Sequence, residues 1–418
     1  MPIRGLALLL TSLSAAAQSG TYSNITDYRV PTARSGPNWI TPGPDGALWF
    51  TESSGNQIAR ITTVGVIVEY PLPPGHNNPQ GIAAGPDGAL WFTEYYGDKI
   101  GRITTAGVIT EYPLPTDICH SCLPSMIAAG PDGALWFTEY GGNSIGRITT
   151  AGAITGYLLP AGESRGPNGI AAGPDGALWF TEWQGNRIGR ITTAGAVTEF
   201  PVPTAGSFPD EIAVGPDGAL WFTEYAGNKI GRITLTGVTT EYPVPAVNSN
   251  PEGITAGPDG ALWFTEFNGN RIARITAAGS ITEYPVPAGS GPAGITAGPD
   301  GALWFTEVSV DTGRAPNIAR APACGLGFSA NFANSSLTMN FNLGIETPAT
   351  FDIVLHGSSG VFRPFSKAIP VIVPPRSFTL RWRPFPDEGQ LTVEPRLTAG
   401  PGLVICSEWT TVNTARGH

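Results

Sequence analysis

The decapeptide Gly43-Pro-Asp-Gly-Ala-Leu-Trp-Phe-Thr-Glu52 occurs seven times in this chain without a single change. The aspartates of the seven copies are Asp45, Asp87, Asp132, Asp175, Asp217, Asp259 and Asp300. The steps between them are 42, 45, 43, 42, 42 and 41 residues. A period in the low forties, with about four strand-like runs in each unit, is typical of a β-propeller. We therefore predict an all-β, seven-bladed β-propeller, in which most repeated residues build blades rather than perform chemistry.

One unit, residues 79–115, shows how the repeat forms a blade. Its four predicted strands are Gly81–Ala84, Ala89–Glu94, Lys99–Thr104 and Ile109–Tyr112. Pro86-Asp87-Gly88 is the predicted turn between the first two strands, and Asp-Gly is expected to supply the positive φ angles of a tight hairpin. Apolar and aromatic residues on both faces of the second strand suit a strand buried between neighbouring blades.

The two ends of the repeat array predict a closed ring. Six units carry all four strands, while the seventh lacks its outer strand. A segment of matching pattern, Ile25-Thr-Asp-Tyr-Arg-Val-Pro31, precedes the first unit. We expect this N-terminal strand to complete the last blade, which removes free sheet edges. The predicted propeller spans residues 24–323.

A different segment follows the repeats. Residues 324–418 contain strand-like runs separated by Gly, Pro, Asn and Ser, which predicts a small β-sandwich-like domain. The runs are Leu337–Asn342, Ala349–Leu355, Ser377–Trp382, Gln390–Val393 and Leu403–Val412.

The beginning of the chain has the pattern of a secretory signal peptide, predicted over residues 1–17. A short basic start precedes a mostly apolar stretch, and Ala15-Ala16-Ala17 offers a cleavage site before Gln18. No apolar run is long enough to span a bilayer. The formal net charge of −10 disfavours nucleic-acid binding. We expect a secreted or periplasmic monomer.

Four cysteines are expected to form disulfides, because an even number in an exported chain favours pairing. The predicted pairs are Cys324 with Cys406, and Cys119 with Cys122. A metal site at Cys119-His120-Ser121-Cys122 would need further ligands. A redox-active C-x-x-C would normally open a helix in a βαβ setting, and that pattern is absent.

Three repeated residues outside the turns are interpreted as structural. Each decapeptide Trp is expected to pack between blades. The Arg of each third strand and the Glu that closes each decapeptide also recur in all seven units. The favoured interpretation is a ring of Arg–Glu or Arg–backbone contacts, since a catalytic residue is not needed seven times. A ring of carboxylates that binds a cation in a channel is the alternative.

The variable loops lie on the face opposite the unchanging turns, and binding residues usually lie on such loops. The residue after Pro in each inner-strand loop should ring the mouth of the central channel. These residues are Asn38, Gln80, Ser125, Asn168, Asp210, Glu252 and Ala293. Next to them, after the decapeptides, come Ser53, Tyr95, Tyr140, Trp183, Tyr225, Phe267 and Val308.

A polar ring flanked by aromatic residues suits a ligand with hydrogen-bonding groups and flat apolar surface, such as a small molecule or an extracellular polymer. The alternative is that the aromatic residues only cover the blade edges. The nearby Asp210, Glu211 and Glu252 form the most acidic sector and suggest a divalent cation. No nucleophilic triad, phosphate loop or H-E-x-x-H motif is present.

The repeat Pro-x-Gly-Ile, Gly-Pro-Asp-Gly-Ala-Leu-Trp-Phe-Thr-Glu, Asn-Lys-Ile-Gly-Arg-Ile-Thr and Ile-Thr-Glu-Tyr-Pro-Leu-Pro closely resembles that of the virginiamycin B lyase (streptogramin lyase) family. The resemblance covers about residues 24–323. It implies a Mg²⁺-assisted elimination that opens the ester of cyclic depsipeptide antibiotics. In that reaction a general base removes the proton beside the ester carbonyl, and the metal and a histidine stabilise the enolate.

The resemblance also implies where the working residues of that family would lie. Its two histidines correspond to Glu252 and Ala293, and one acidic residue corresponds to Gly291. A second acidic residue is matched by Glu307, although every unit has this Glu. Alanine neither transfers a proton nor binds a metal. We therefore expect the scaffold of the family to be kept and its chemistry to be lost or changed.

Two hypotheses of different kinds follow. In the first, the protein is an exported binding propeller that presents its variable face to a small molecule or extracellular polymer. In the second, it is a carbon–oxygen lyase with a rearranged carboxylate metal site around Asp210, Glu252, Glu266 and Glu307, with Mg²⁺ as cofactor. A purely structural role in a cell-surface assembly is a weaker third option.

Overall fold

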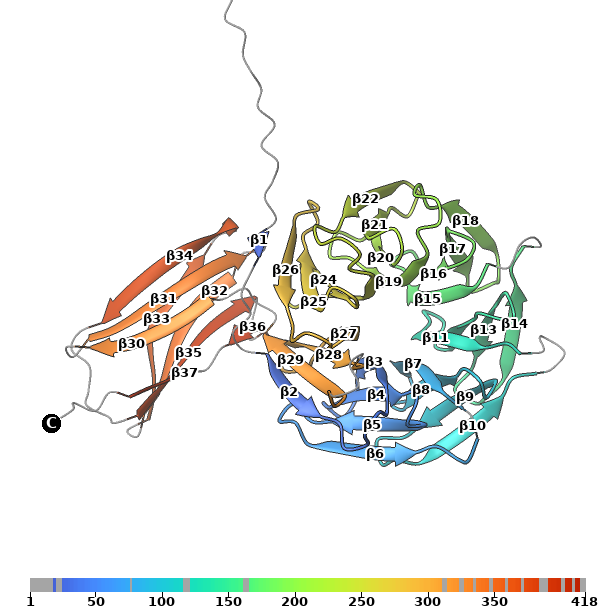
Figure 1. The fold of residues 1–418 in the computed structure, drawn as a ribbon, viewed down its shortest axis with the longest axis horizontal. Helices are drawn as coiled ribbons and strands as arrows, with labels where there is room; N and C mark the ends of the chain where they lie inside the picture. Colours follow the sequence, from blue (N-terminus) through green and yellow to red (C-terminus); the bar gives the residue numbers. More distant parts are fainter. Residues whose placement is uncertain are drawn as a thin grey trace, which may run out of the picture.

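The computed structural model describes residues 18–19, 25–75, 77–115, 121–160, 165–309 and 314–322, together with eight strands between residues 327 and 413. Seven sheets, each with four antiparallel propeller strands, follow one another around a centre (Figure 1). In the first six blades the four propeller strands run in sequence order from the centre to the rim, and in the seventh the N-terminal β2 takes the outer place, which confirms the predicted seven-bladed β-propeller. The predicted signal segment, residues 1–17, lies outside the described residues.

The first four blades have the following strands. Blade one comprises β3 (Pro37–Pro42), β4 (Leu48–Glu52), β5 (Gln57–Ile61) and β6 (Ile67–Pro71). Blade two comprises β7 (Pro79–Ala84), β8 (Leu90–Glu94), β9 (Lys99–Ile103) and β10 (Ile109–Pro113). Blade three comprises β11 (Pro124–Ala129), β12 (Leu135–Glu139), β13 (Ser144–Ile148) and β14 (Ile154–Leu158). Blade four comprises β15 (Pro167–Ala172), β16 (Ala177–Glu182), β17 (Arg187–Thr192) and β18 (Val197–Pro201).

The last three blades complete the ring. Blade five comprises β19 (Pro209–Val214), β20 (Leu220–Glu224), β21 (Lys229–Ile233) and β22 (Thr239–Pro243). Blade six comprises β23 (Pro251–Ala256), β24 (Leu262–Glu266), β25 (Arg271–Ile275) and β26 (Ile281–Pro285). Blade seven comprises β27 (Pro292–Ala297), β28 (Ala302–Glu307), β29 (Asn317–Pro322) and β2 (Thr26–Arg29).

The N-terminal strand closes the propeller as predicted. Strand β2 pairs antiparallel with β29, with Tyr28 opposite Ile318. The last blade thereby gains its missing outer strand, and β27 packs beside β3 of blade one. A short strand that the sequence did not predict, β1 (Gln18–Ser19), pairs parallel with β26 of blade six.

The turn of each decapeptide differs from the prediction in one detail. In blade two the amide of Gly88 donates to the carbonyl of Gly85 at 3.2 Å, and the amide of Gly85 donates to that of Ala89 at 2.7 Å. Of the Asp-Gly pair, only Gly88 has a positive φ, at 73°. A three-residue loop of this kind is a type I turn followed by one left-handed residue, so the expected positive φ at Asp87 was wrong.

The repeated Arg also contacts a different partner from the one predicted. Arg102 Nε donates to Asp87 at 2.7 Å, and Trp91 Nε1 donates to the same carboxylate at 3.0 Å. The Arg–Asp and Trp–Asp contacts recur in all seven blades. Burial raises the pKa of Asp87, but the bonds from Trp91 and Arg102 outweigh it and hold the pKa below its ordinary value. The Arg–Glu ring was therefore the wrong pairing.

The decapeptide tryptophans pack between blades, as predicted. All seven are 0% exposed. Trp49 of blade one packs against Ile82 and Phe92 of blade two, and its ring stacks on Tyr70 with 5.5 Å between centroids. Burying one such ring stabilises the fold by about 2–3 kcal/mol, so the seven inter-blade clusters form the core of the propeller.

The segment after the propeller also forms strands. Its two sheets are ordered β30-β31-β34 and β33-β32-β35-β36, with β37 also pairing with β35. The bounds are β30 (Gly327–Ala333), β31 (Ser336–Ile345), β32 (Ala349–Gly357), β33 (Gly360–Ile369), β34 (Ile372–Trp382), β35 (Gln390–Ala399), β36 (Leu403–Ser407) and β37 (Thr410–Asn413). The sequence missed β30 and β33, and a sandwich arrangement of these strands stays a prediction.

The structure describes only some of the cysteines for which disulfides were predicted. Cys122 is disulfide-bonded, and its predicted partner Cys119 lies outside the described residues, as does Cys324. Both predicted pairings therefore stay predictions. Within the described part of the chain, no helix is long and apolar enough to cross a membrane.

Candidate functional site

A ring of threonine hydrogen bonds fixes the mouth of the central channel. Thr51 Oγ1 accepts from the amide of Trp39 in its own blade at 3.1 Å and donates to the carbonyl of Gln80 in the next blade at 2.7 Å. The equivalent donation occurs at every blade junction at 2.5–2.7 Å, and Thr306 closes the circle onto Asn38. The decapeptide thus holds each variable residue by its backbone and leaves the side chain free to differ.

The predicted polar ring is assembled into two hydrogen-bonded chains. Asn38 Nδ2 donates to Gln80 Oε1 across blades one and two, and Gln80 Nε2 donates to Asn78 at 2.6 Å. Ser125 Oγ donates to Asn168 Oδ1 at 2.6 Å. Asn168 Nδ2 in turn donates to Asp210 Oδ1. These bonds orient the amides, so the mouth presents fixed donors and acceptors to a ligand.

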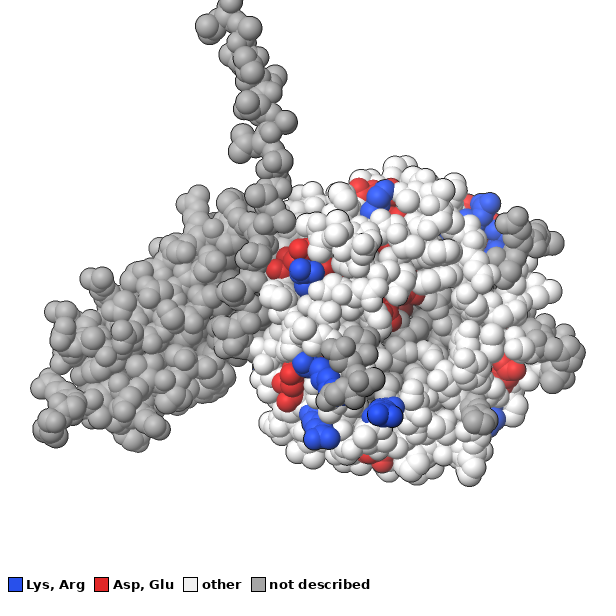
Figure 2. All heavy atoms as spheres, in the orientation of Figure 1, with Lys and Arg blue, Asp and Glu red and all other residues white. Residues whose placement is uncertain are grey.

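Three carboxyl groups follow one another at the end of this second chain. Burial raises the pKa of Asp210 to about 7, although the bond from Asn168 opposes the rise. Burial, and then the charge of Asp210, raise the pKa of Glu211 to about 8. Burial, then Asp210 and Glu211, raise the pKa of Glu252 well above its ordinary value. Figure 2 shows acidic atoms in the hollow at the centre of the propeller.

Aromatic side chains extend from blade two to blade five. Tyr95 lies edge-on to Tyr96 at 5.1 Å and tilted to Tyr140 at 6.5 Å. Trp183 stacks on Phe208 at 5.3 Å and lies tilted to Tyr225 at the same distance. We call these six residues the aromatic crescent.

One side chain joins the two halves of the aromatic crescent. Gln184 Nε2 donates to the hydroxyl of Tyr140 at 3.0 Å. Phe267, also predicted for this surface, has no ring contact among the described residues that places it in the crescent. The sequence therefore identified four of the six members by position, and it missed Tyr96 and Phe208.

Phe208 is the unexpected member, and its backbone explains why it was missed. It has φ at 51°, a left-handed conformation that is unfavourable for a bulky residue. Residues at the same place in the other blades also have positive φ, and five of those six are Gly or Asn. They are Gly36, Asn78, Leu123, Gly166, Asn250 and Gly291. Comparing these positions across the repeats would have marked Leu123 and Phe208 as unusual, and of the two only Phe208 is aromatic.

The other predicted carboxylates lie away from the channel. Glu266 and Glu307 are 0% exposed and lie inside their blades. Glu266 lies 4.0 Å from Arg271, and Glu307 lies 2.9 Å from Arg314. Burial, and then the charge of Glu283, raise the pKa of Glu266 to about 8. The structure therefore brings Asp210 and Glu252 together but not the four-carboxylate group predicted for a metal.

The side chains at the channel mouth do not form a set of ligands for Mg²⁺. In the described residues no group of three His, Cys, Asp or Glu side chains is arranged to hold a metal ion. Mg²⁺ requires near-octahedral oxygen ligands. Asp210 also gives one oxygen to Asn168. The residues present do not fit the ion, and we derive no chemical step through it.

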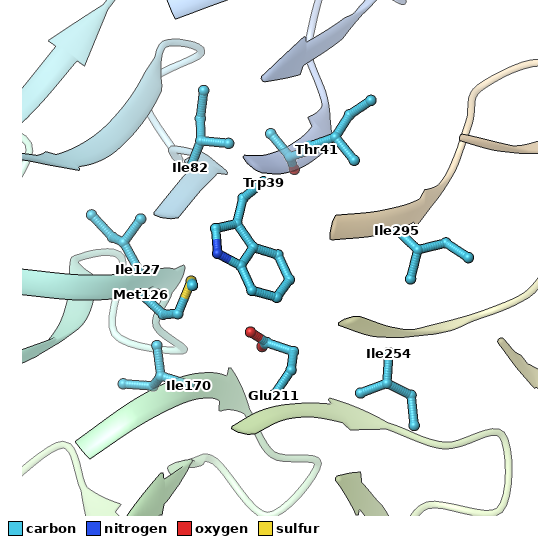
Figure 3. Close-up of a pocket in the computed structure, with 10 residues that line it drawn as sticks. Trp39, Thr41, Ile82, Met126, Ile127, Ile170, Glu211, Ile254 and Ile295 are labelled. Carbon is cyan, nitrogen blue, oxygen red and sulfur yellow. The ribbon is translucent and has the colours of Figure 1, made fainter. Parts of the chain in front are cut away.

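A cavity of about 130 Å³ lies in the channel beside the polar ring. Its walls include Trp39, Met126 and Glu211, which point toward one another in Figure 3, and an isoleucine from most of the inner strands. No single repeat unit, considered alone, predicts this cavity. The signal lies between units, because the position after the polar ring is Gly in four blades and a large residue in three.

Both the sequence and the structure of this chain are similar to those of known proteins. Residues 11–165 and 118–307 match the model of the virginiamycin B lyase family. A virginiamycin B lyase of Bacillus licheniformis is 49% identical over 41 residues, which make up 10% of this chain and 14% of that protein.

Solved structures match over far more of the chain. A streptogramin B lyase structure is 40% identical, with a TM-score of 0.67, over 71% of this chain and 96% of that one. A catalytically inactive histidine-to-alanine variant of the Staphylococcus aureus virginiamycin B lyase, with quinupristin, is 43% identical. Its TM-score is 0.66, over 71% of this chain and 98% of that one.

Proposed function

The chain belongs to the virginiamycin B lyase family, and from that premise we propose that it is a binding propeller. Its ligand is a small molecule, or a unit of an extracellular polymer, that carries flat apolar groups beside hydrogen-bonding groups. The variable face holds this ligand, and the lyase reaction is lost.

The observation that carries the proposal is the aromatic crescent beside the polar ring. Tyr96 is 65% exposed and Phe208 is 37% exposed, so the crescent offers ring surface to solvent. Aromatic rings that keep a fixed orientation contribute large contact area at low entropic cost. Phe208 also keeps an unfavourable backbone conformation that Gly or Asn would relieve. Strain of this kind is typical of functional sites.

Loss of the lyase reaction is inferred from two positions. The family resemblance assigns its histidines to Glu252 and Ala293. Ala293 is 1% exposed and has no group that transfers a proton. In the Staphylococcus aureus relative, a variant with alanine in place of one histidine is catalytically inactive. Since no acidic residue stands at Gly291 either, we infer that the base and its support are both missing.

Quinupristin, with which the inactive relative was solved, is the probe for a direct test. The purified protein is titrated with quinupristin by calorimetry and, separately, incubated with it and Mg²⁺ before chromatography and mass spectrometry. We expect the antibiotic to stay intact. A product of unchanged mass and shifted retention would overturn the loss of lyase chemistry, because elimination opens the ring without changing its mass.

A second candidate rests on Glu252. Its pKa is raised well above the ordinary value by burial and then by Asp210 and Glu211, and perturbed carboxyls in a concave site suit proton transfer. In this alternative Glu252 acts as the general base of a carbon–oxygen lyase. Product that forms with the unaltered protein and disappears with Glu252→Gln would favour it. Product that persists with Glu252→Gln would exclude Glu252 as the base.

The proposal has two further parts, which concern the export of the protein and the role of its C-terminal segment. We propose that residues 1–17 are removed on secretion and that residues 324–418 form a spacer or attachment module. Intact-mass measurement of the protein expressed in a bacterial host tests the first point, because cleavage would leave Gln18 at the N-terminus. Size-exclusion chromatography with light scattering tests the expected monomer.

A further inference from the structure

The inner strands of neighbouring blades approach too closely for side chains at every position. Four blades have Gly directly after the polar-ring residue. A Cβ at Gly81 would lie 2.8 Å from Met126 Cα, and one at Gly294 would lie 2.9 Å from Trp39 Cα. A Cβ at Gly169 would likewise lie 2.8 Å from Glu211 Cα. These distances are shorter than the normal separation between two carbon atoms that are not bonded. A blade with a large residue directly after its polar-ring residue therefore needs Gly at the same position of the preceding blade.

This rule places three large side chains in the channel, from alternate blades. Trp39 comes from β3 of blade one, Met126 from β11 of blade three and Glu211 from β19 of blade five. Figure 3 shows them converging on one space from three sides. They enclose the cavity of about 130 Å³ together with Ile82, Ile127 and other isoleucines.

Glu211 is the one charged residue in the wall of this cavity. In the described part of the chain no Lys or Arg side chain pairs with it, and the charged groups acting on it are acidic. The repeated carboxylates differ, since all seven decapeptide aspartates have an Arg partner. An unpaired carboxyl beside apolar walls is costly when ionised, and a positively charged ligand would offset that cost.

We propose that this cavity binds a small organic cation, a primary ammonium that bears one compact apolar group. The ammonium contacts the Glu211 carboxylate. The ring of Trp39 offers its face to the positive charge, and the thioether of Met126 adapts to the apolar group. A metal ion fits less well, because Thr41 is the one lining residue besides Glu211 with a side-chain oxygen, and isoleucines make up most of the wall. The proposal does not rest on the function assigned to the aromatic crescent.

Benzylamine is a suitable probe, and benzyl alcohol is its neutral control. The chain has three methionines, Met1, Met126 and Met339, so ¹³C-methyl labelling gives few signals, and Met126→Leu assigns the one of interest. We expect benzylamine to shift the Met126 signal saturably and to leave that of Met339 unchanged. Benzyl alcohol should shift neither. An equal response to the alcohol would overturn the proposal, because the charge would then play no part.

The Glu211→Gln variant completes the test. Glutamine has the shape of the protonated acid, so the fold should be kept, as circular dichroism and melting would show. Losing a charge-assisted contact should weaken benzylamine binding by about tenfold or more. Trp39→Leu gives a second, uncharged disruption of the same cavity. Unchanged affinity in both variants, or absence of any Met126 shift with the unaltered protein, would refute the site.

Binding should also depend on pH in the unaltered protein only. The groups near Glu211 are Asp210 and Glu252, with Tyr225 beside them. Because burial and Asp210 raise the pKa of Glu211 to about 8, the ammonium must displace a proton near neutrality. Affinity should rise about 20-fold between about pH 6.5 and pH 8.5. A flat profile, or the same profile in Glu211→Gln, would contradict the assignment of the cation to Glu211.

Discussion

The buried carboxyl of Glu52 should make the stability of the propeller depend on pH. Its side chain is 0% exposed, and neither oxygen meets a hydrogen-bond partner at normal geometry. Burial raises its pKa to about 7, the hydroxyl of Ser35 opposes the rise and Glu69 adds to it. The native pKa lies above the ordinary value of 4.5, so the unfolded chain loses its proton first as pH rises. The contribution of the protonated Glu52 carboxyl to the free energy of unfolding is therefore fully present below pH 4.5, and it is lost as the pH rises through about 7.

The size of the effect follows from the difference between the two pKa values. Each unit of difference between the native and unfolded pKa values corresponds to about 1.4 kcal/mol. The ionisation of Glu52 is therefore expected to lower the free energy of unfolding by ~3 kcal/mol at pH 9 relative to pH 4. Glutamine has the shape of the protonated acid and never ionises. Glu52→Gln should thus change the free energy of unfolding by less than about 0.5 kcal/mol near pH 4. At pH 9 it should stabilise the protein by ~3 kcal/mol.

Urea denaturation followed by tryptophan fluorescence, at pH 4, 7 and 9, measures this difference. Asp45→Asn is the matched control. Burial raises the pKa of Asp45, but bonds from Arg60 and Trp49 outweigh it and hold the pKa below 3.8, so this carboxylate is ionised at pH 7 and 9. Asp45→Asn should destabilise equally at those two pH values. An equal effect of Glu52→Gln at pH 4 and pH 9 would refute the reasoning.

Three further substitutions test the ring of threonine hydrogen bonds and the aromatic crescent. Thr306→Val removes the hydroxyl that bonds Asn38 at 2.6 Å, and it should lower the free energy of unfolding by about 1–3 kcal/mol in the same denaturation assay. Thr306→Ser, which keeps the bond, should lose much less. Trp183→Ala should weaken quinupristin binding about tenfold or more by calorimetry, and a smaller loss than with Tyr96→Ala would contradict a central role for Trp183. Phe208→Asn should weaken binding yet leave stability within about 1 kcal/mol, since relief of the backbone conformation offsets the lost stacking on Trp183. Clear destabilisation would show that Phe208 serves the fold.

The blade could be predicted from sequence because its period, turns and strand patterns agree with one another. The predicted contact between the repeated Arg and the repeated Glu was wrong. Recurrence in every unit shows that both residues belong to the blade, but it does not show that their side chains are in contact. Register decides the partner. Arg102 lies opposite Trp91 in the hairpin, whereas Glu94 lies opposite Lys99. Asp87 precedes Trp91 by four residues across the turn, and so it is Asp87 that reaches Arg102.

The site was predictable only where it follows the repeat. The polar ring has one member in each unit at a fixed offset, and the structure places Asn38, Gln80, Asn168 and Asp210 at the channel mouth through their shared backbone bonds. Whether a side chain lines the cavity depends instead on which residue the neighbouring blade has at the same position. Glu211 enters the channel because Gly169 leaves room for it. Such a relation between units is invisible when the units are averaged.

Under the proposed binding function, the residues that depart from the repeat are the informative ones. The decapeptide is identical in all seven units, so differences between the blades cannot come from it. At the left-handed position before the inner strand, Gly and Asn in five blades satisfy the backbone, which shows what stability alone requires. Phe208 meets that requirement poorly, and its ring lies on Trp183 in the aromatic crescent. A residue that costs the fold something and adds ring surface to the aromatic crescent is best explained by a ligand.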